Sequence, residues 1–336
     1  MKAKHTKFLF LFLILLFQSC SGQEKINGVS FVAAGIPVTE KHVNPVVEVN
    51  ANFAAIMPFS FVKGLNNPEI IHDAKRQWFG ETRAGVKQYA ESLKAKGIKI
   101  MVKPQIWVWN GEFTGYIKME TEADWKRLEE TYTNFILEYA DLAQEINAEI
   151  LCIGTELEQF VANRPDYWGS LIIEIKKVYK GKLTYAANWD EFKRTPFWSA
   201  LDYIGVDAYF PVSESKTPTI AESIEGWKTH KVVIKNLSKR YKKPVLFTEY
   251  GYRSVDFAGK EPWKSDRSMT TINLEAQNNL TKALFETFWE EQWFAGGFIW
   301  KWLIEHDKVG GESNNQFTPQ NKPVEKIIKA HFEAQQ

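Results

Sequence analysis

Short apolar runs recur along the chain, and each is followed by a longer stretch that has helical spacing of apolar residues or forms a loop. A continuous apolar run of about four to eight residues is typical of a strand covered on both faces, as in a parallel sheet. The pattern predicts strands at Gly28–Val32, Phe53–Pro58, Ile98–Val102 continuing to Trp109, Glu149–Ile153, Leu183–Ala187, Tyr203–Val206, Pro244–Phe247 and Gly297–Trp300.

The stretches between these runs indicate how the strands are connected. Segments such as GVKQYAESLKAKG, WKRLEETYTNFILEYADLAQEI and LEAQNNLTKALFETFWEEQ are amphipathic at the period of an α-helix. Eight strands that alternate with helices predict a (β/α)8 TIM barrel, a single domain that we expect to span residues 25–334. A doubly wound sheet is the alternative. We favour the barrel because the runs are spread over the whole domain, with one short tail helix at Val324–Phe332.

The first twenty residues have the pattern of an export signal. Three lysines among the first seven residues precede the apolar run Phe8–Phe17, which is followed by Gln18, Ser19 and Cys20. A small residue before a cysteine resembles a bacterial lipoprotein cleavage site, although Gln18 is bulkier than usual. We therefore expect residues 1–19 to be a signal peptide and Cys20 to carry a lipid that anchors an exported protein to a membrane of the cell envelope. Plain secretion, or release into the periplasm, is the alternative.

The amino-acid composition limits the kinds of molecule that this protein is expected to bind. The chain has 42 basic and 41 acidic residues, a net charge of +1 and no extended run of one sign, so a nucleic-acid partner is not expected. Aromatic residues make up 14% of the chain and fit either a binding surface for a neutral partner or a packed core. The six histidines are dispersed without the spacing of a metal site, so no metal is expected.

Two of the predicted strands end on the same pair of residues, Thr followed by Glu. The run LCIGTE ends at Glu156 and the run VLFTE ends at Glu249. The carboxyl ends of all strands meet on one face of a barrel, where chemistry is done. Because an ionised carboxylate is costly to bury without a partner or a purpose, two of them facing one cavity indicate the carboxyl pair of glycoside hydrolysis. The alternative for each Glu is a helix cap or an ion pair.

The motifs around these two residues resemble a known family. LCIGTELEQF, IGVDAYFP, VLFTEYGY and IMVKPQIWVWNG are similar to glycoside hydrolase family 113 of the clan A barrels. The resemblance implies a retaining enzyme that acts chiefly on β-1,4-mannan, with Glu156 as the general acid/base and Glu249 as the nucleophile. The partner would then be a β-linked polysaccharide or oligosaccharide. Hydrolysis by two carboxyl groups needs only water and the sugar, so no cofactor is expected.

Further polar residues at strand ends are candidates for supporting this chemistry. By the resemblance, the phenol of Tyr209 donates a hydrogen bond that keeps Glu249 ionised. Asp207 is expected to orient either a sugar hydroxyl or a neighbouring lysine. Thr155 stands where many clan A members have an asparagine that holds the sugar 2-hydroxyl, so we expect this contact from another residue, such as Asn188.

The other expected sugar contacts are Lys103, Gln105, Trp107, Trp109, Trp189, Tyr252, Trp300 and Trp302. Alternation along a strand puts Trp107 and Trp109 on one side and Trp300 and Trp302 together on another, so members of each pair can belong to the core. We favour Trp300 for stacking on a sugar ring. A lysine at the position of Lys103, inside a barrel mouth, would be unusual without a carboxylate or substrate to meet.

Other functions are compatible with the same barrel. The enzyme alternatives are hydrolysis of another β-glycan and transglycosylation. From a different class, the alternative is a carbohydrate-binding lipoprotein without catalytic activity. The pair Glu156 and Glu249 argues against it, because a binding module has no reason to bury two carboxylates facing each other.

Overall fold

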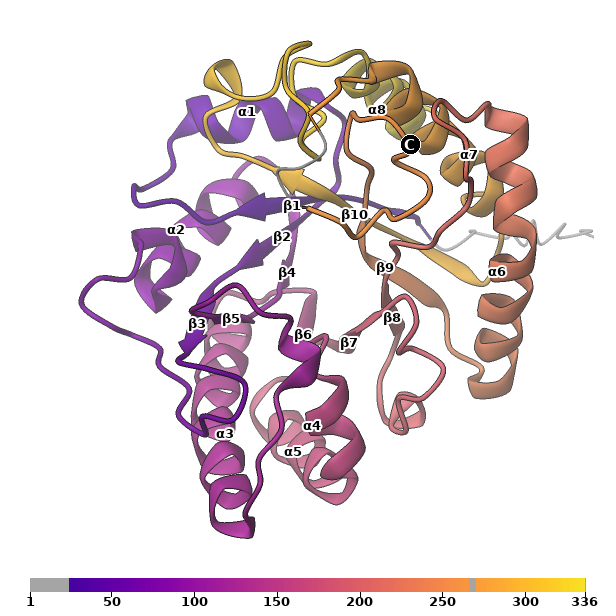
Figure 1. Cartoon of the computed structure of the whole chain (residues 1–336). Helices are drawn as coiled ribbons and strands as arrows, with labels where there is room; N and C mark the ends of the chain where they lie inside the picture. The colour runs from indigo at the N-terminus through magenta and orange to yellow at the C-terminus, as the bar shows by residue number, and fades with distance from the viewer. Residues whose placement is uncertain (1–23, 266–269, 336) are drawn as a thin grey trace, which may run out of the picture.

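Eight parallel strands close into a barrel in the computed structural model, which describes residues 24–265 and 270–335 (Figure 1). The strands are β1 (Ile26–Val32), β2 (Phe53–Met57), β4 (Lys99–Val102), β6 (Ile150–Thr155), β7 (Lys182–Asn188), β8 (Ile204–Asp207), β9 (Val245–Tyr250) and β10 (Phe294–Trp302). They follow one another in chain order around the barrel, and β10 pairs with β1 to close it. The predicted (β/α)8 fold is confirmed, with one strand of the barrel at each predicted run.

Helices surround this barrel on the outside (Figure 1). They are α1 (Glu40–Glu48), α2 (Arg83–Lys94), α3 (Glu122–Glu145), α4 (Glu158–Asn163), α5 (Pro165–Val178), α6 (Ile220–Tyr241), α7 (Leu274–Phe288) and α8 (Pro323–Glu333). Four of them are capped by a residue whose side chain accepts a hydrogen bond from a backbone N–H of the first turn. These residues are Thr82, Thr121, Thr219 and Asn273. Within the described ranges, no helix has the length and apolar character needed to cross a membrane.

The apolar core has two layers, one inside the barrel and one between the barrel and its helices. The inner layer is small and is built from Ile26, Phe53, Ala55, Met101, Ile150, Cys152, Ala186, Leu246, Ala295 and Phe298. The outer layer is larger and holds the apolar faces of the helices. Toward the carboxyl ends of the strands the inner layer becomes polar, because Lys103, Asp207 and Thr248 lie there without exposure to solvent. The carboxyl-terminal face of the barrel is therefore organised by buried polar groups rather than by apolar packing.

The run predicted to continue from Ile98 to Trp109 is two strands, and this prediction was wrong. Strand β4 ends before Lys103 and Pro104, and β5 (Gln105–Val108) pairs with β3 (Phe59–Val62) in a separate two-stranded parallel sheet. The neighbouring chain segment behaves in the same way, since Pro58 separates β2 from β3. A proline has no N–H for the ladder, so each barrel strand stops at its proline and the pair continues above the barrel mouth.

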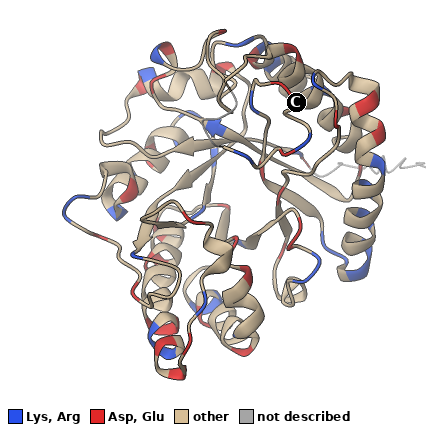
Figure 2. Ribbon diagram, viewed as in Figure 1, with Lys and Arg blue, Asp and Glu red and all other residues tan. Residues whose placement is uncertain are grey.

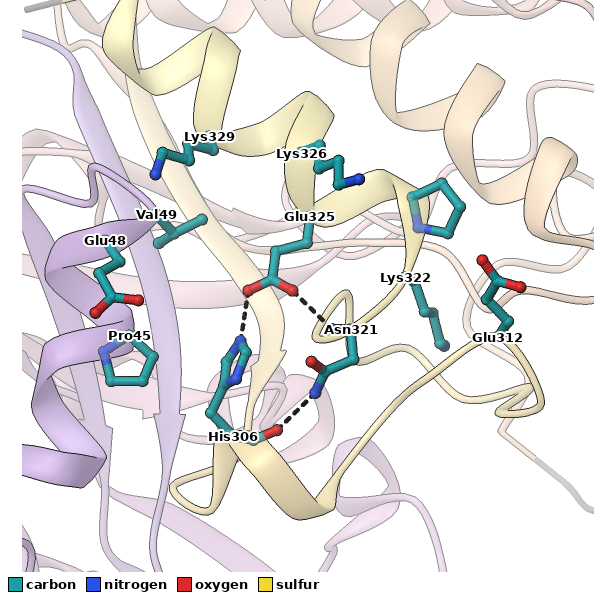
Figure 3. Close-up of a pocket in the computed structure, with 11 residues that line it drawn as sticks. Pro45, Glu48, Val49, His306, Glu312, Asn321, Lys322, Glu325, Lys326 and Lys329 are labelled. Carbon is teal, nitrogen blue, oxygen red and sulfur yellow. Dashed lines mark hydrogen bonds and ion pairs between the residues drawn. The ribbon is translucent and has the colours of Figure 1, made fainter.

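A pocket of about 410 Å³ lies at the rim, between α1 and α8 (Figure 3). His306 Nε2 is 2.6 Å from Glu325 Oε1, and the backbone N–H of Asn321 donates to Glu325 Oε2 at 2.6 Å. Asn321 Nδ2 also donates to the carbonyl of His306 at 2.6 Å. These polar groups bond to one another across the pocket, so they fasten the start of α8 to the segment after β10. Neither Glu156 nor Glu249 lines this pocket.

Candidate active site

Glu156 and Glu249 lie at the carboxyl ends of β6 and β9, and both ends depart from regular strand geometry. Between Phe247 and Glu249, the register of β9 against β8 shifts by one residue, so that Asp207 pairs with Glu249. Such a bulge lets Thr248 and Glu249, which would alternate in a regular strand, both approach the barrel mouth. The geometry that brings Glu249 inward is thus a local irregularity next to the site.

The carboxylate of Glu249 is held by three donors. Gln105 Nε2 donates to its Oε1 at 3.0 Å, the hydroxyl of Tyr209 donates to its Oε2 at 2.7 Å, and Lys103 forms an ion pair with Oε1. Glu249 is 6% exposed, so these bonds are shielded from water and keep the carboxylate in one orientation. The hydrogen bond from Tyr209 is the one expected from the sequence.

Lys103 and Asp207 form a buried charge pair beneath Glu249. The Lys103 Nζ lies 3.3 Å from Asp207 Oδ1, which also accepts a hydrogen bond of 2.7 Å from the hydroxyl of Thr248. Both side chains are fully buried, so the expected direct contact of Lys103 with substrate does not fit the structure, and Asp207 orients the lysine rather than a sugar hydroxyl. Burial and the charge of Glu249 raise the pKa of Asp207 to about 7 although Lys103 opposes this shift. Burial disfavours the charged form of Lys103, but the two carboxylates outweigh it and raise its pKa.

Glu156 occupies a strained backbone position at the end of β6. Its φ is +51°, in the left-handed region that residues other than glycine rarely adopt, at a cost of roughly 1–3 kcal/mol. Its N–H donates to the carbonyl of Ala186 on β7 at 2.8 Å, and the next N–H, of Leu157, donates to the hydroxyl of Tyr185 at 2.7 Å. Burial raises the pKa of Glu156 well above its usual range, and the negative charges of Asp207 and Glu249 raise it further. Both effects favour the protonated form of this carboxyl group.

A buried carboxyl that the sequence analysis missed supports this position. Glu191, only 2% exposed, accepts hydrogen bonds from the hydroxyl of Tyr185 at 2.8 Å and from the N–H of Asn188 at 3.0 Å. Through Tyr185 it is connected to the backbone beside Glu156. Burial raises the pKa of Glu191 to about 8. The sequence gives one indication of this role, which is that Glu191 follows Asn188 by three residues in the strand-end segment NWDEF.

The aromatic candidates divide into exposed and buried groups. Trp107 is 50% exposed and Trp109 is 57% exposed, both beside the two-stranded sheet above the mouth. Trp189 is partly buried and stacks on Trp263, a residue of the loop after β9, with ring centroids 5.1 Å apart. Trp302 is fully buried in the outer core layer and is not available for stacking on a sugar.

Tyr252 is also buried, at 2% exposure, so the contact with sugar expected of it does not fit its position in the outer core layer. Asn188 is partly buried at the end of β7, and its Oδ1 accepts a hydrogen bond from the N–H of Trp189 at 2.8 Å. Within the described part of the chain, its side-chain amide nitrogen donates to no other protein group and is therefore available to a sugar hydroxyl. Asn188 thus stays a candidate for the contact that the asparagine before the acid/base makes in other clan A members.

The pairing of Trp300 with Trp302 predicted by alternation was wrong because β10 contains a bulge. Val29 of β1 pairs with Ile299, whereas Phe31 pairs with Trp302, so two residues of β10 stand opposite one residue of β1. Ile299 and Trp302 both face the outer core layer, and Trp300 between them is half-buried. Trp300 therefore keeps a position compatible with stacking on a sugar, while Trp302 does not.

Charged residues have different surroundings on the surface helices and in the barrel mouth. Charges of both signs are spread over the helices that surround the barrel (Figure 2), and the partners of most of them lie in exposed pairs. In the mouth, by contrast, burial and nearby negative charge favour the protonated form of Glu156, and Glu249 is surrounded by donors. A proton donor and a carboxylate at the same barrel mouth can carry out acid-assisted displacement at a sugar carbon. Among the described residues, no three His, Cys, Asp or Glu side chains are grouped as metal ligands.

Comparisons with known proteins bear on this assignment. The family model described as Glycoside Hydrolase Family 113 matches residues 36–322. The structure of the family 113 β-mannanase from Alicyclobacillus acidocaldarius in complex with ManMIm aligns with a TM-score of 0.81 and 22% identity, over 93% of this chain and 98% of that chain. A complex structure of a family 113 β-1,4-mannanase aligns with a TM-score of 0.81 and 23% identity, over 93% of this chain and 99% of that chain.

A more distant likeness shows the barrel alone. The β-glucuronidase of Faecalibacterium prausnitzii aligns with a TM-score of 0.60 and 14% identity, over 92% of this chain but only 49% of that chain. A comparison with curated proteins found no match to this sequence. The family model covers most of the chain, including both strand-end glutamates and the residues bonded to Glu249. The chain therefore belongs to glycoside hydrolase family 113 and is a (β/α)8 glycoside hydrolase.

Proposed function

We propose that this protein hydrolyses β-1,4-mannan with retention of configuration at the anomeric carbon. The observation that carries the proposal is the contrast between the two carboxyl groups in the mouth. Burial and neighbouring negative charge favour the protonated form of Glu156, while Glu249 receives hydrogen bonds from Gln105 and Tyr209 and contacts the charge of Lys103. Two carboxyl groups with opposite protonation are what a double displacement needs.

The reaction has two steps. In the first, Glu249 attacks the anomeric carbon while the bond from that carbon to the leaving oxygen breaks, and Glu156 gives its proton to the leaving oxygen. A glycosyl ester on Glu249 and an ionised Glu156 result. In the second step, Glu156 takes a proton from water, whose oxygen attacks the same carbon and releases Glu249. Both carboxyl groups return to their starting states.

Three observations support mannan as the substrate. The family 113 structures that align over nearly the whole chain are those of β-mannanases. The exposed indoles of Trp107 and Trp109 provide flat apolar surfaces near the mouth, and such surfaces suit the faces of neutral sugar rings. The near-neutral balance of charge in the chain also fits an uncharged polymer.

The test is the release of reducing sugar from β-1,4-mannan and manno-oligosaccharides by the protein beginning at residue 21, so that no lipid is attached. The wild type is compared with Glu249→Gln and with the control Glu174→Gln, whose side chain is 51% exposed on α5. We expect activity in the wild type and the control and its loss in Glu249→Gln. Proton NMR of the first product then gives the anomer. An initial β-anomer supports retention, and an initial α-anomer would contradict it.

If the wild type is inactive on mannan but active on another β-glycan, the proposed substrate is wrong and the proposed chemistry still stands. A wild type that binds β-glycans without cleaving any of them would instead favour the non-catalytic alternative. Transglycosylation is recognised in the same reactions as products longer than the substrate.

We also propose that the protein is exported and held at a membrane by a lipid on Cys20. The support is the N-terminal sequence itself, because residues 1–23 lie outside the described part of the structure. The test is expression of the full chain and of Cys20→Ala in a bacterial host supplied with radiolabelled palmitate. We expect label and membrane association in the wild type and neither in the variant. Unlabelled wild type in the soluble fraction would contradict the proposal.

A further inference from the structure

The bulge in β10 brings a lysine to the barrel mouth that the sequence analysis passed over. Trp300 and Lys301 are the two residues that stand opposite the single residue Ser30 of β1. The residues on either side of them, Ile299 and Trp302, pack in the outer core layer, of which Trp300 is not a member, and Trp300 and Lys301 are both half-buried. In a regular strand, the side chain of one of these two residues would point to the outer core layer. The extra residue of the bulge allows both side chains to point toward the mouth.

Lys301 lies in the electrostatic field of the expected nucleophile. Burial lowers the pKa of Lys301, and the charge of Glu249 opposes this shift. The Nζ lies 5.6 Å from the ring centroid of Trp300, within the range of a cation–π contact. The cation, the expected stacking surface and the expected nucleophile thus share one region of the mouth.

The ammonium of Lys301 has no hydrogen bond or ion pair in the described residues. The oxygens of Glu249 are occupied by other donors, since Oε1 accepts from Gln105 and pairs with Lys103, and Oε2 accepts from Tyr209. An ammonium has three donors, and a half-buried one without acceptors loses hydration that nothing in the protein replaces. Acceptors must then come from water or from whatever occupies the mouth.

The charge balance of the site agrees with a cation that is reserved for a ligand. The buried Lys103 contacts both Asp207 and Glu249, so its ammonium is engaged by these carboxyl groups and is not available to a ligand. Lys301 supplies the second positive charge without bonding to either carboxylate. The negative charge of Glu249 therefore attracts the ammonium of Lys301, while its three N–H donors remain available to a ligand.

We propose that Lys301 is a substrate-binding residue, whose ammonium donates hydrogen bonds to hydroxyl oxygens of the sugar that lies over Glu249 and stacks on Trp300. This inference rests on the proposed function, because it names a contact at the same site. The ligand is a neutral β-1,4-linked manno-oligosaccharide. Hydroxyl oxygens of the bound ring replace water around the ammonium, and the contact fixes the ring relative to the nucleophile.

The experiment measures binding separately from turnover. Glu156→Gln is used as an inactive background, because a neutral amide resembles the protonated carboxyl that this residue carries before reaction. Binding of mannohexaose is measured by calorimetry for Glu156→Gln alone and with Lys301→Met, Lys301→Arg or Lys308→Met added. Lys308 is the matched control, since its side chain is 62% exposed on the segment after β10 and pairs with Glu305.

We expect Lys301→Met to weaken binding roughly tenfold to a hundredfold, the range for one hydrogen bond from a charged donor. Lys301→Arg should recover part of the affinity, and Lys308→Met should leave it unchanged. Thermal unfolding of each variant checks that the barrel is intact, and the arginine variant keeps a cation at the site if methionine disturbs the fold.

Two results would overturn the inference while the proposed function stands. One is a wild type that cleaves mannan together with unchanged binding in the Lys301→Met variant. The other is unchanged binding with a shifted acid limb of the pH–rate profile when Lys301→Met is placed in the active protein, because Lys301 would then act only through the charge of Glu249. A wild type that neither binds nor cleaves manno-oligosaccharides would overturn the proposed function and this contact together.

Discussion

Replacing Lys103 by methionine tests whether a buried ion pair holds the nucleophile. The side chains of Lys103 and Asp207 are fully buried, and that of Glu249 is 9% exposed. Methionine nearly fills the same volume, so the main change is the loss of one positive charge between two carboxylates. Removing one partner of a buried pair typically costs about 3–5 kcal/mol of unfolding free energy, because the charge that remains is left uncompensated.

The loss of unfolding free energy in Lys103→Met should depend on pH, whereas the loss caused by a packing defect would not. Lys103 lowers the pKa of Asp207 against burial and the charge of Glu249, so its removal raises the folded-state pKa of Asp207 above the value of about 7. A carboxyl whose pKa is raised on folding binds protons in the folded state, and its contribution to stability is lost as pH rises from the unfolded to the folded pKa. The destabilisation of Lys103→Met should therefore be larger at pH 8 than at pH 5.

The assay is urea unfolding followed by tryptophan fluorescence at both pH values. The control is Lys182→Met, which removes a lysine whose side chain is 62% exposed and lies 3.2 Å from Asp202. We expect that control to cost at most about 1 kcal/mol. The double variant Lys103→Met with Asp207→Asn should regain most of the stability without regaining activity. A loss of equal size at both pH values, or no loss, would refute the charge argument.

Four further predictions follow from the site. Glu156→Gln should slow mannan hydrolysis by about 10² or more, whereas an aryl mannoside with an acidic phenol should still give a burst of phenol in stopped-flow assays. Tyr209→Phe should lower kcat/KM by roughly tenfold, since the phenol lies 2.7 Å from the carboxylate that it orients; an unchanged kcat/KM would contradict this. Burial raises the pKa of Glu191 to about 8, so the wild type should lose stability as pH rises from the ordinary range of a glutamate to this value, and Glu191→Gln should flatten that slope in urea unfolding. Trp107→Ala should weaken oligosaccharide binding with little change in stability, whereas Trp302→Ala, at a fully buried position, should cost about 3–5 kcal/mol.

Much of the fold follows from local patterns in the sequence. Apolar runs and amphipathic segments depend on which residues must leave water, and that requirement places eight strands and the surrounding helices without knowledge of the contacts. The same reasoning brings Glu156 and Glu249 to one face, because parallel strands in a barrel all end on the same side. The split of the predicted third strand could also have been anticipated, since Pro104 cannot donate to the ladder.

The environment of each site residue could not be obtained in this way. Lys103 and Asp207 are 104 positions apart in the chain, and Glu191 acts beside Glu156 only because β6 and β7 are neighbours. Whether a lysine at a strand end meets a sugar or a carboxylate depends on which side chains other strands send to the same point. Burial, and with it the direction of each pKa shift, likewise depends on the whole barrel.

What the sequence determined by itself was the number and order of the barrel strands and the face on which their carboxyl ends meet. Local periodicity is sufficient for these, because it reflects which residues must leave water. Only the tertiary structure decided which neighbouring residues point inward, because the register shifts in β9 and β10 interrupt strict alternation. The shift in β9 brings Glu249 toward the mouth, and the shift in β10 leaves Trp302 in the outer core layer while Trp300 is half-buried.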